Sequence, residues 1–232
     1  MKKNILILGG TSGIGLELVK QMEGDNHLIV ASRSNESLSG MNLTHIPFDV
    51  ETDSLDVSEL PSTLDGLVYC PGTINLRPFK GLKPEVFERD FSINVMGAVK
   101  VLQSVLGLLQ NSETPASVVF FSTVAVGTGM PFHASVATAK GALEGLSRSL
   151  AAELSPKVRF NVIAPSLVDT PLAEKFLNND TKKANAAARH PLQRVGKPKE
   201  IAEMTKFLLS DDSSWMTAQT LTIDGGIGSI KS

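Results

Sequence analysis

Short runs of apolar residues alternate along the chain with longer amphipathic stretches. The short runs are rich in β-branched and aromatic residues and lack strict polar alternation, which is typical of strands covered on both faces. This pattern predicts seven strands: "NILIL" (4–8), "HLIVAS" (27–32), "HIPFDV" (45–50), "DGLVYC" (65–70), "SVVFFS" (117–122), "RFNVIA" (159–164) and "TLTID" (220–224).

The longer stretches carry apolar residues at helical spacing and predict helices over 13–22, 86–110, 134–154 and 199–209. Strands that alternate with helices form a parallel sheet with right-handed crossovers and helices on both faces. No repeat, low-complexity tract or long linker interrupts the pattern. We therefore expect one Rossmann-like, doubly wound α/β domain over residues 1–232, with ligands bound beyond the carboxyl ends of the strands.

One stretch, 170–191, departs from this pattern because it is long, polar and weakly patterned ("TPLAEKFLNNDTKKANAAARHP"). A mobile lid over the ligand site would have such a sequence. A packed surface helix is the alternative.

The first predicted strand runs into a glycine-rich turn that opens the first predicted helix, "LILGGTSGIGLELVKQ". Gly9, Gly13 and Gly15 lack the Cβ atoms that would keep a pyrophosphate away from backbone N–H groups. The positive end of the helix dipole also favours that anion. The spacing G-x-x-x-G-x-G is a variant of the common fingerprint, but its strand–turn–helix context favours dinucleotide binding over a merely tight turn.

The end of the second strand indicates which dinucleotide binds. An acidic residue there would hydrogen-bond the adenosine ribose, whereas this chain has Ser32, Arg33 and Ser34. A guanidinium pairs well with a 2′-phosphate, and the serine hydroxyls, with that of Ser12, can assist it. A solvated arginine is the alternative. We expect NADP(H) rather than NAD(H), with Asp49 contacting the adenine.

The composition is that of a protein with a sizeable buried core, since 42% of the residues are apolar and 20% are charged. A net charge of −2 gives no reason to expect nucleic acid or an anionic membrane as a partner. Cys70 is the only cysteine, which excludes a disulfide within the chain and fits a reducing compartment. No segment has metal-ligand spacing, a signal-peptide pattern or the length of a membrane span. We expect a cytoplasmic protein without a resident metal.

Further motifs follow the glycine turn in a fixed order: "DV" (49–50), "YCPG" (69–72), "SINVMG" (92–97), "FFSTVA" (120–125), "NVIAPSLVDTPL" (161–172), "RVGKPKEIA" (194–202) and "LTIDGG" (221–226). Together they resemble the short-chain dehydrogenase/reductase family nearly end to end. Two departures are "YCPG", where the family usually has Asn-Asn-Ala-Gly, and Ser166, where it usually has glycine.

The resemblance implies an NADP(H) site assembled from many segments of the chain. Its cofactor-binding residues are Gly9, Thr11, Ser12, Gly13, Ile14, Gly15, Ser32, Arg33, Ser34, Asp49, Val50, Cys70, Pro71, Gly72, Lys140, Pro165, Val168 and Thr170.

The family's chemistry uses a tyrosine four residues before a lysine, a spacing that puts both side chains on one helix face. The lysine lowers the tyrosine pKa and binds the nicotinamide ribose, a serine orients the substrate, and an asparagine holds a water for proton relay. The resemblance places the last three roles on Lys140, Thr123 and Asn94, but Val136 stands at the tyrosine position. The chain's one tyrosine, Tyr69, is expected beside the dinucleotide and away from the nicotinamide.

Two routes could replace the missing phenol. His133 lies seven residues before Lys140, two helical turns, as the tyrosine does in the enoyl-thioester reductase branch, and an imidazole is a competent proton donor near neutral pH. Its alternative role is to cap or pack the helix start. In the second route hydride adds to a conjugated C=C bond, and hydrogen bonds from Thr123, Ser122 and the ribose stabilise the enolate. Ser135 is expected to point elsewhere.

Two functions stay open. The first is an NADP(H)-dependent oxidoreductase that reduces a carbonyl or an activated C=C bond of a small, moderately apolar substrate. The second is a non-catalytic NADP(H)-binding sensor or scaffold, which Val136 and the departures at 69–71 and Ser166 favour. The resemblance also implies a homodimer or homotetramer built on helices 86–110 and 134–154.

The substrate pocket is expected between segments 73–80 and 126–132 and the lid. Arg77 could meet an anionic group there or remain solvated, the commoner fate of a charged side chain. The apolar residues expected in the pocket are Leu76, Pro78, Met130, Phe132 and Phe176.

Overall fold

A sheet of seven parallel strands forms the centre of the molecule. The computed structural model describes residues 2–230. The strands lie in the order β3-β2-β1-β4-β5-β6-β7. Their bounds are β1 (Asn4–Leu8), β2 (His27–Ser32), β3 (Thr44–Pro47), β4 (Gly66–Tyr69), β5 (Ala116–Phe121), β6 (Val158–Pro165) and β7 (Thr220–Ile223). The doubly wound, Rossmann-like prediction is confirmed.

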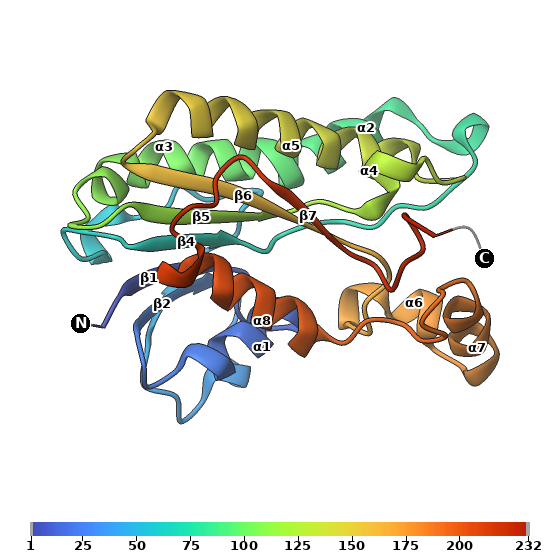
Figure 1. The fold of residues 1–232 in the computed structure, drawn as a ribbon, viewed down its shortest axis with the longest axis horizontal. Coiled ribbons are helices and arrows are strands. Elements are labelled where there is room, and N and C mark those ends of the chain that lie inside the picture. The colour runs from blue at the N-terminus through green and yellow to red at the C-terminus, as the bar shows by residue number, and fades with distance from the viewer. Residues whose placement is uncertain (1, 231–232) are drawn as a thin grey trace.

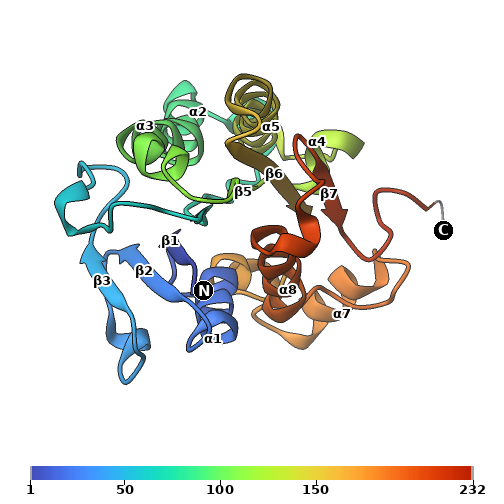
Figure 2. The ribbon, with the colours of Figure 1, turned by 60° about the vertical axis from the view of Figure 1, so that its left-hand side comes forward.

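Helices cover both faces of this sheet (Figures 1 and 2). One face carries α2 (Pro84–Phe91), α3 (Gly97–Gln110) and α5 (Ala134–Leu154), and the other carries α1 (Gly13–Met22) and α8 (Pro198–Leu209). Successive strand side chains point to opposite faces, so β1 contributes to two cores. Leu6 and Leu8 pack beneath the first helix layer, and Ile5 and Ile7 pack beneath the second.

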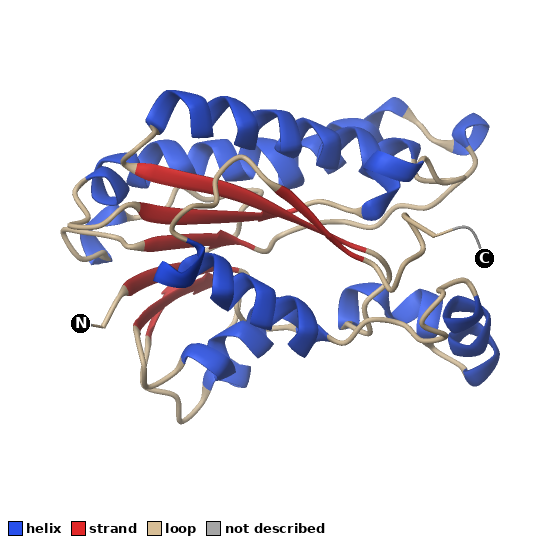
Figure 3. Ribbon diagram, in the orientation of Figure 1, coloured by secondary structure: helices blue, strands red, loops and turns tan. Residues whose placement is uncertain are grey.

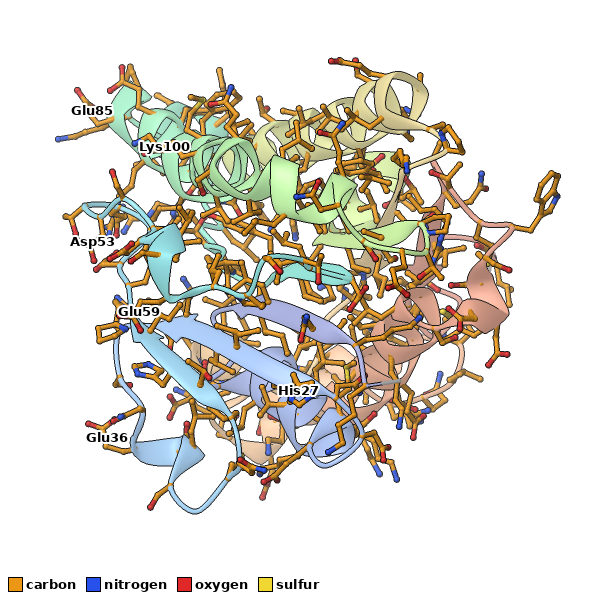
Figure 4. The ribbon with its side chains drawn as sticks, turned by 90° about the vertical axis from the view of Figure 1, so that its left-hand side faces the viewer. His27, Glu36, Asp53, Glu59, Glu85 and Lys100 are labelled. Carbon is orange, nitrogen blue, oxygen red and sulfur yellow. The ribbon has the colours of Figure 1, made fainter. Side chains whose placement is uncertain are left out.

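The shorter elements lie in the connections. They are α4 (Val124–Thr128) and the 3-10 turns η1 (Glu36–Leu38), η2 (Val57–Glu59), η3 (Phe79–Gly81) and η6 (Asp211–Ser213). Figure 3 shows the loops that join strands to helices beyond both ends of the sheet. In Figure 4 the exposed charged side chains of Glu36, Asp53, Glu59, Glu85 and Lys100 project from the outer surface.

The third strand is shorter than the sequence predicted. It ends at Pro47, not at residue 50, because the chain turns over 49–53. The Asp53 carboxylate accepts the Asp49 N–H at 2.7 Å, and the Asp53 N–H donates to the Asp49 carbonyl at 2.8 Å. Asp49 therefore stands past the carboxyl end of the strand, where ligands bind in such sheets. The other six predicted strands differ from the observed bounds by at most one residue at either end.

The helix predicted over 86–110 begins at Pro84 and contains a π-helical turn, η4 (Ser92–Met96). Such a turn breaks the regular pairing of backbone carbonyls. The buried hydroxyl of Tyr69 donates to the Ile93 carbonyl at 2.5 Å, and a Cβ on Gly97 would overlap that hydroxyl. The expectation that Tyr69 lies beside the dinucleotide is therefore wrong, since its side chain is in the core, and burial raises the pKa of its phenol.

The same helical stretch corrects the expectation that no segment reaches membrane-spanning length. Pro84–Gln110 has 27 residues and is apolar enough to cross a membrane by length and composition. Half of the most apolar 18-residue stretch of this helix is buried inside the structure. Val101, Leu102 and Val105 belong to the core on the sheet, so the helix is apolar because it packs there.

The segment 170–191 is largely helical. It forms η5 (Pro171–Ala173), α6 (Glu174–Leu177) and α7 (Asp180–Ala188). Ala173, Leu177 and Ala186 make a small apolar cluster of their own. The segment therefore has the form of packed surface helices, which was the alternative to a lid. These short helices lie beyond the carboxyl ends of β6 and β7 (Figure 1). That the segment moves as a lid stays a prediction.

Candidate active site

A cleft of about 1140 Å³ opens where β1 to β6 end, between these strand ends, α5 and the 170–191 segment. Of the site residues that the sequence predicted, Asn94 alone does not line it. Those that do are Gly9, Thr11, Ser12, Gly13, Ile14, Gly15, Ser32, Arg33, Ser34, Asp49, Val50, Cys70, Pro71, Gly72, Thr123, His133, Lys140, Pro165, Val168 and Thr170.

The glycine turn brings backbone into this cleft. A Cβ on Gly15 would overlap the Gly9 carbonyl oxygen, so the turn closes this tightly only with glycine there. Ser12 precedes α1, and its side chain makes no capping hydrogen bond to that helix. The first turn of α1 therefore offers unpaired N–H groups and a hydroxyl to an anion.

The end of β2 lies beside the glycine turn. The Ser32 hydroxyl donates to the Ser34 carbonyl at 2.9 Å and lies 3.0 Å from Nε2 of His45, a neighbour on β3 that the sequence did not single out. Arg33 and Ser34 are exposed at the rim of the cleft. A guanidinium and a hydroxyl at this point suit a phosphate monoester better than a ribose diol.

Lys140 and Asn94 approach each other beneath Gly72. A Cβ on Gly72 would lie 3.2 Å from Lys140 Nζ and 3.1 Å from Asn94 Oδ1, so glycine gives both groups room. Lys140 is 7% exposed, and burial lowers the pKa of its ammonium to about 8. Burial raises the pKa of the adjacent Cys70 thiol to about 12, which leaves it without nucleophilic character near neutral pH.

A buried carboxylate that the sequence did not single out, Asp90, organises this region. It accepts hydrogen bonds from Thr73 Oγ1 at 2.6 Å, Asn75 Nδ2 at 2.7 Å and Ser135 Oγ at 2.5 Å. Thr73 Oγ1 in turn accepts from Asn94 Nδ2 at 2.9 Å, and the Asp90 carbonyl accepts from the same nitrogen at 2.7 Å. Asp90 thus ties α2 to the loop after β4 and to the start of α5. Ser135 points to Asp90 and does not line the cleft, which confirms that its side chain points elsewhere.

These bonds fix which way the Asn94 amide faces. Its nitrogen donates to Thr73 Oγ1 and to the Asp90 carbonyl, so the other amide atom, Oδ1, is the one near Lys140 and Gly72. Asn94 is fully buried, and no donor among residues 2–230 reaches Oδ1. A buried acceptor without a donor is costly, so this atom is suited to a water or a ligand hydroxyl.

Thr123 and Ser122 end β5 with different partners. Thr123 is the N-cap of α4, where its Oγ1 accepts from the Ala125 N–H at 3.3 Å, so its own hydroxyl proton can be donated into the cleft. Ser122 donates to Glu144 at 2.5 Å. Ser122 lines the cleft but its hydroxyl proton is committed to Glu144, so a hydrogen bond from Ser122 to the substrate stays a prediction.

His133 lies at the N-cap of α5, one residue before the helix begins, and Val136 lines the cleft on the next turn. His133 Nδ1 lies 2.7 Å from the Pro131 carbonyl oxygen, which can only accept, so Nδ1 carries a proton. Its Nε2 is then the atom that exchanges a proton. His133 can act as an acid from Nε2 as the imidazolium.

A second pair that sequence reasoning missed joins the two ends of the 165–190 region. His190 Nδ1 lies 2.8 Å from the Ala186 carbonyl, and Nε2 lies 2.9 Å from Ser166 Oγ. Since Nδ1 must donate to the carbonyl, neutral His190 accepts the Ser166 proton. The pair fastens the end of α7 to the loop after β6, and its separation of 24 residues leaves no local signal.

Only some of the residues expected in the substrate pocket line the cleft. Leu76, Met130 and Phe176 line the cleft. Pro78, Phe132 and Arg77 do not, because they lie outside its lining on exposed parts of the chain. Arg77 therefore does not meet an anion there.

A Rossmann-like sheet with a glycine turn, a phosphate-compatible strand end and a buried lysine in one cleft defines a dinucleotide-binding protein class. Residues 10–228 match a family model described as Enoyl-(Acyl carrier protein) reductase. The chain is 30% identical over 235 residues to L-xylulose reductase of Bos taurus, covering 97% of this chain and 96% of that protein.

Solved structures show the same similarity. A short-chain type dehydrogenase/reductase from Mycobacterium ulcerans superposes with a TM-score of 0.88 and 26% identity over 97% of this chain and 90% of that one. RhlG of Pseudomonas aeruginosa, solved as an NADP active-site complex, gives a TM-score of 0.89 and 26% identity over 97% and 96%. The chain belongs to the short-chain dehydrogenase/reductase family, a family of oxidoreductases.

The buried ammonium of Lys140 leads to a stability prediction. The folded-state pKa is about 8 and the ordinary value is 10.5, so the unfolded chain binds more protons between these values. The contribution of Lys140 to the wild-type free energy of unfolding should therefore become more favourable as pH increases from 8 to 10.5. At pH 7, Lys140→Met should raise the free energy of unfolding by about 1–3 kcal/mol.

Urea unfolding at pH 7 and pH 10 measures both effects, and the gap between wild type and Lys140→Met should narrow at pH 10. Lys100→Met, which removes an exposed ammonium, is the matched control and should not change the pH dependence. Parallel pH profiles for wild type and Lys140→Met would contradict the argument.

Proposed function

We propose that the protein is an NADP(H)-dependent oxidoreductase that reduces a carbonyl or an activated C=C bond. The observation that carries this proposal is that Lys140 Nζ, in the cleft wall, and the buried Asn94 Oδ1 both lie next to Gly72, and that this oxygen lacks a protein donor among the described residues. A fold used only for its shape has no need of such a pair, because each member costs stability unless a ligand or water completes it.

The residues present fit NADP(H). Gly15 lets the turn close near a pyrophosphate, and Ser12 keeps a hydroxyl beside the first turn of α1. Arg33, exposed in the cleft at the end of β2, would pair with a 2′-phosphate, and the similar RhlG structure carries NADP. When bound, the cofactor supplies or accepts the hydride.

The chain's own residues would then position the reactants. Lys140 donates hydrogen bonds to the ribose hydroxyls, and Thr123 donates one to the substrate oxygen that gains electron density. Asn94 Oδ1 accepts from a water that connects Lys140 with solvent. In this scheme Lys140 acts as a charged donor, so cofactor binding should be strongest below about pH 8, where Lys140 is protonated.

The proton donor is the non-standard part of the proposal. Val136 is buried four residues before Lys140, where the family's tyrosine would stand, and it has no proton to give. The His133 imidazolium would instead donate from Nε2 to the substrate oxygen, while Nδ1 stays bonded to the Pro131 carbonyl. With a conjugated C=C substrate, Thr123 would stabilise the enolate and the carbon would be protonated later.

A second candidate function is a non-catalytic NADP(H)-binding sensor or scaffold. Val136 favours it, because an apolar side chain occupies the wall of the cleft one turn from Lys140. In that case the cofactor would change the affinity for a partner and no substrate would be consumed.

The proposal includes a cytoplasmic homodimer or homotetramer. Phe91 and Met96 on the Pro84–Gln110 helix are about 40% exposed, and Phe87 joins them in an apolar depression that also borders α5. An interface between two copies would cover these side chains. Light scattering should give a mass of two or four chains, and a monomer at micromolar concentration would reject this part.

The cofactor preference is tested at Arg33. Arg33→Ala should weaken NADPH binding by about 10- to 100-fold, since a charged hydrogen bond to phosphate contributes about 1.5–3 kcal/mol, and it should leave NADH binding unchanged. Calorimetry measures both affinities. Arg77→Ala is the control, because Arg77 is exposed and lies outside the cleft. Equal binding of NADH and NADPH by wild type would refute the NADP(H) preference.

The proton donor is tested with NADPH and a panel of ketones, quinones, enones and enoyl-CoA esters. If His133 is the acid for a carbonyl, His133→Ala should lower kcat by about 10²-fold or more and leave NADPH affinity unchanged. Lys140→Ala should also weaken NADPH binding. Wild-type protein that binds NADPH and consumes no panel member would favour the sensor. If enones alone react and His133→Ala has no effect, the donor role of His133 is refuted.

A further inference from the structure

The two ends of the cleft differ in charge. Asp49 and Glu51, which follow β3, are the carboxylates among its described lining residues. The 170–191 segment follows β6, and β3 and β6 are five steps apart in the strand order. At about 4.8 Å for each step these two strands are about 24 Å apart along the sheet. The 170–191 segment reaches back from β6 to Gly13 and to the loop after β4, and none of its residues that line the cleft is a carboxylate.

The cations of the cleft divide into those with a role and those without one. Arg89 pairs with Glu51 through two contacts, at 3.1 and 3.2 Å. Arg33 and Lys140 have the cofactor roles proposed above. Three lining cations are left over, and all belong to the 170–191 segment: Lys175, Lys182 and Arg189.

Two of the leftover cations, Lys175 and Lys182, are held by neutral groups. Lys175 Nζ donates to the Ile74 carbonyl at 2.6 Å, across the cleft mouth. Lys182 Nζ donates to the Lys175 carbonyl and to Asn178 Oδ1, both at 2.9 Å. These acceptors orient the ammonium groups but do not cancel their charge, and Lys182 keeps one N–H to donate.

The arrangement on α7 and at its C-cap is directional. Lys182, Asn185, Ala186 and Arg189 all line the cleft and are spaced by three or four residues, so they share one side of the helix. Lys183 lies off this stripe and pairs with Asp169 at 3.6 Å. The paired lysine faces away from the cleft lining, and the uncompensated cations face into it.

We propose that the substrate carries an oxyanion, a carboxylate or a phosphate, on an apolar body, and that Lys182 and Arg189 bind this anion with the Asn185 amide. The inference rests on the proposed oxidoreductase function and names its substrate class. Leu76, Met130 and Phe176 supply apolar contacts for the rest of the molecule. The anion would also draw the 170–191 segment onto the bound substrate, because its cations come from α7 and its C-cap.

The same cations could instead serve the helix itself or the cofactor. Arg189 is the C-cap of α7, where the helix dipole favours any cation. A role in the helix alone predicts no effect of charge on substrate use. Contact with the cofactor's phosphates predicts weaker NADPH binding when the cations are removed.

The experiment compares matched substrates in the full-length protein: 4-oxopentanoate with its methyl ester, and crotonyl-CoA with crotonyl N-acetylcysteamine. Wild type should use the anionic member of at least one pair with a kcat/KM about tenfold higher or more, an advantage that falls with added salt. The double variant Lys182→Gln, Arg189→Gln should lose that advantage, mainly through KM. The double variant should change the NADPH affinity and the kcat/KM for the neutral substrate by less than about twofold. Lys183→Gln is the control and should behave as wild type.

The two pairs distinguish a carboxylate from a phosphate-bearing thioester, and either result supports the inference. Equal use of anionic and neutral substrates by wild type overturns it, as does a tenfold loss of NADPH affinity in the double variant. If no substrate is turned over, calorimetry with NADPH-loaded protein and butyryl-CoA or pentanoate separates the failures. If wild type binds one of these anions and the double variant does not, the anion site is supported and the oxidoreductase function is rejected. If wild type binds neither anion, the anion site is rejected.

Discussion

The burial of the Lys140 ammonium is the constraint around which this site is built. A charge that is 7% exposed has lost most of its hydration, and the neighbouring groups only partly compensate, so its pKa falls to about 8. Gly72 leaves room for the ammonium, Asn94 presents an oxygen beside it, and Asp90 holds Asn94 through Thr73. The buried ammonium and the unpartnered oxygen each cost solvation, a cost that a bound ligand or water would offset.

The sequence predicted the parts of this arrangement that depend on local pattern. The bounds of α5 and α1 were correct because their apolar spacing and flanking residues are clear, and the glycine turn was recognisable from its strand–turn–helix context. Lys140 and Asn94 were found through the resemblance to a family. That both lie next to Gly72 was not predicted, because it depends on how β4, η4 and α5 pack together.

The features that the sequence did not reveal are all tertiary. Asp90 and Ser135 are 45 residues apart, and Ser166 and His190 are 24 apart, so neither pair leaves a signal at helical or strand spacing. Tyr69 was misplaced for the same reason, since only the π turn at Ser92–Met96 explains why a phenol is needed inside the core. The 170–191 segment could not be assigned because its short helices are stabilised by a small cluster of Ala173, Leu177 and Ala186 and not by a long apolar stripe.

Val136 changes what Lys140 can contribute. Where a tyrosine stands four residues before a lysine, the ammonium can lower the phenol pKa and so set the acid strength at the reacting oxygen. Val136 has no proton for the ammonium to influence, so in the proposed mechanism Lys140 would act through the cofactor ribose and through its electric field. A field stabilises an enolate or an alkoxide without moving a proton, and it acts on any anion that enters the cleft. In the proposed function, Val136 and the surplus of cations on the 170–191 segment are therefore consistent with each other, because both would favour chemistry in which binding negative charge matters more than immediate protonation.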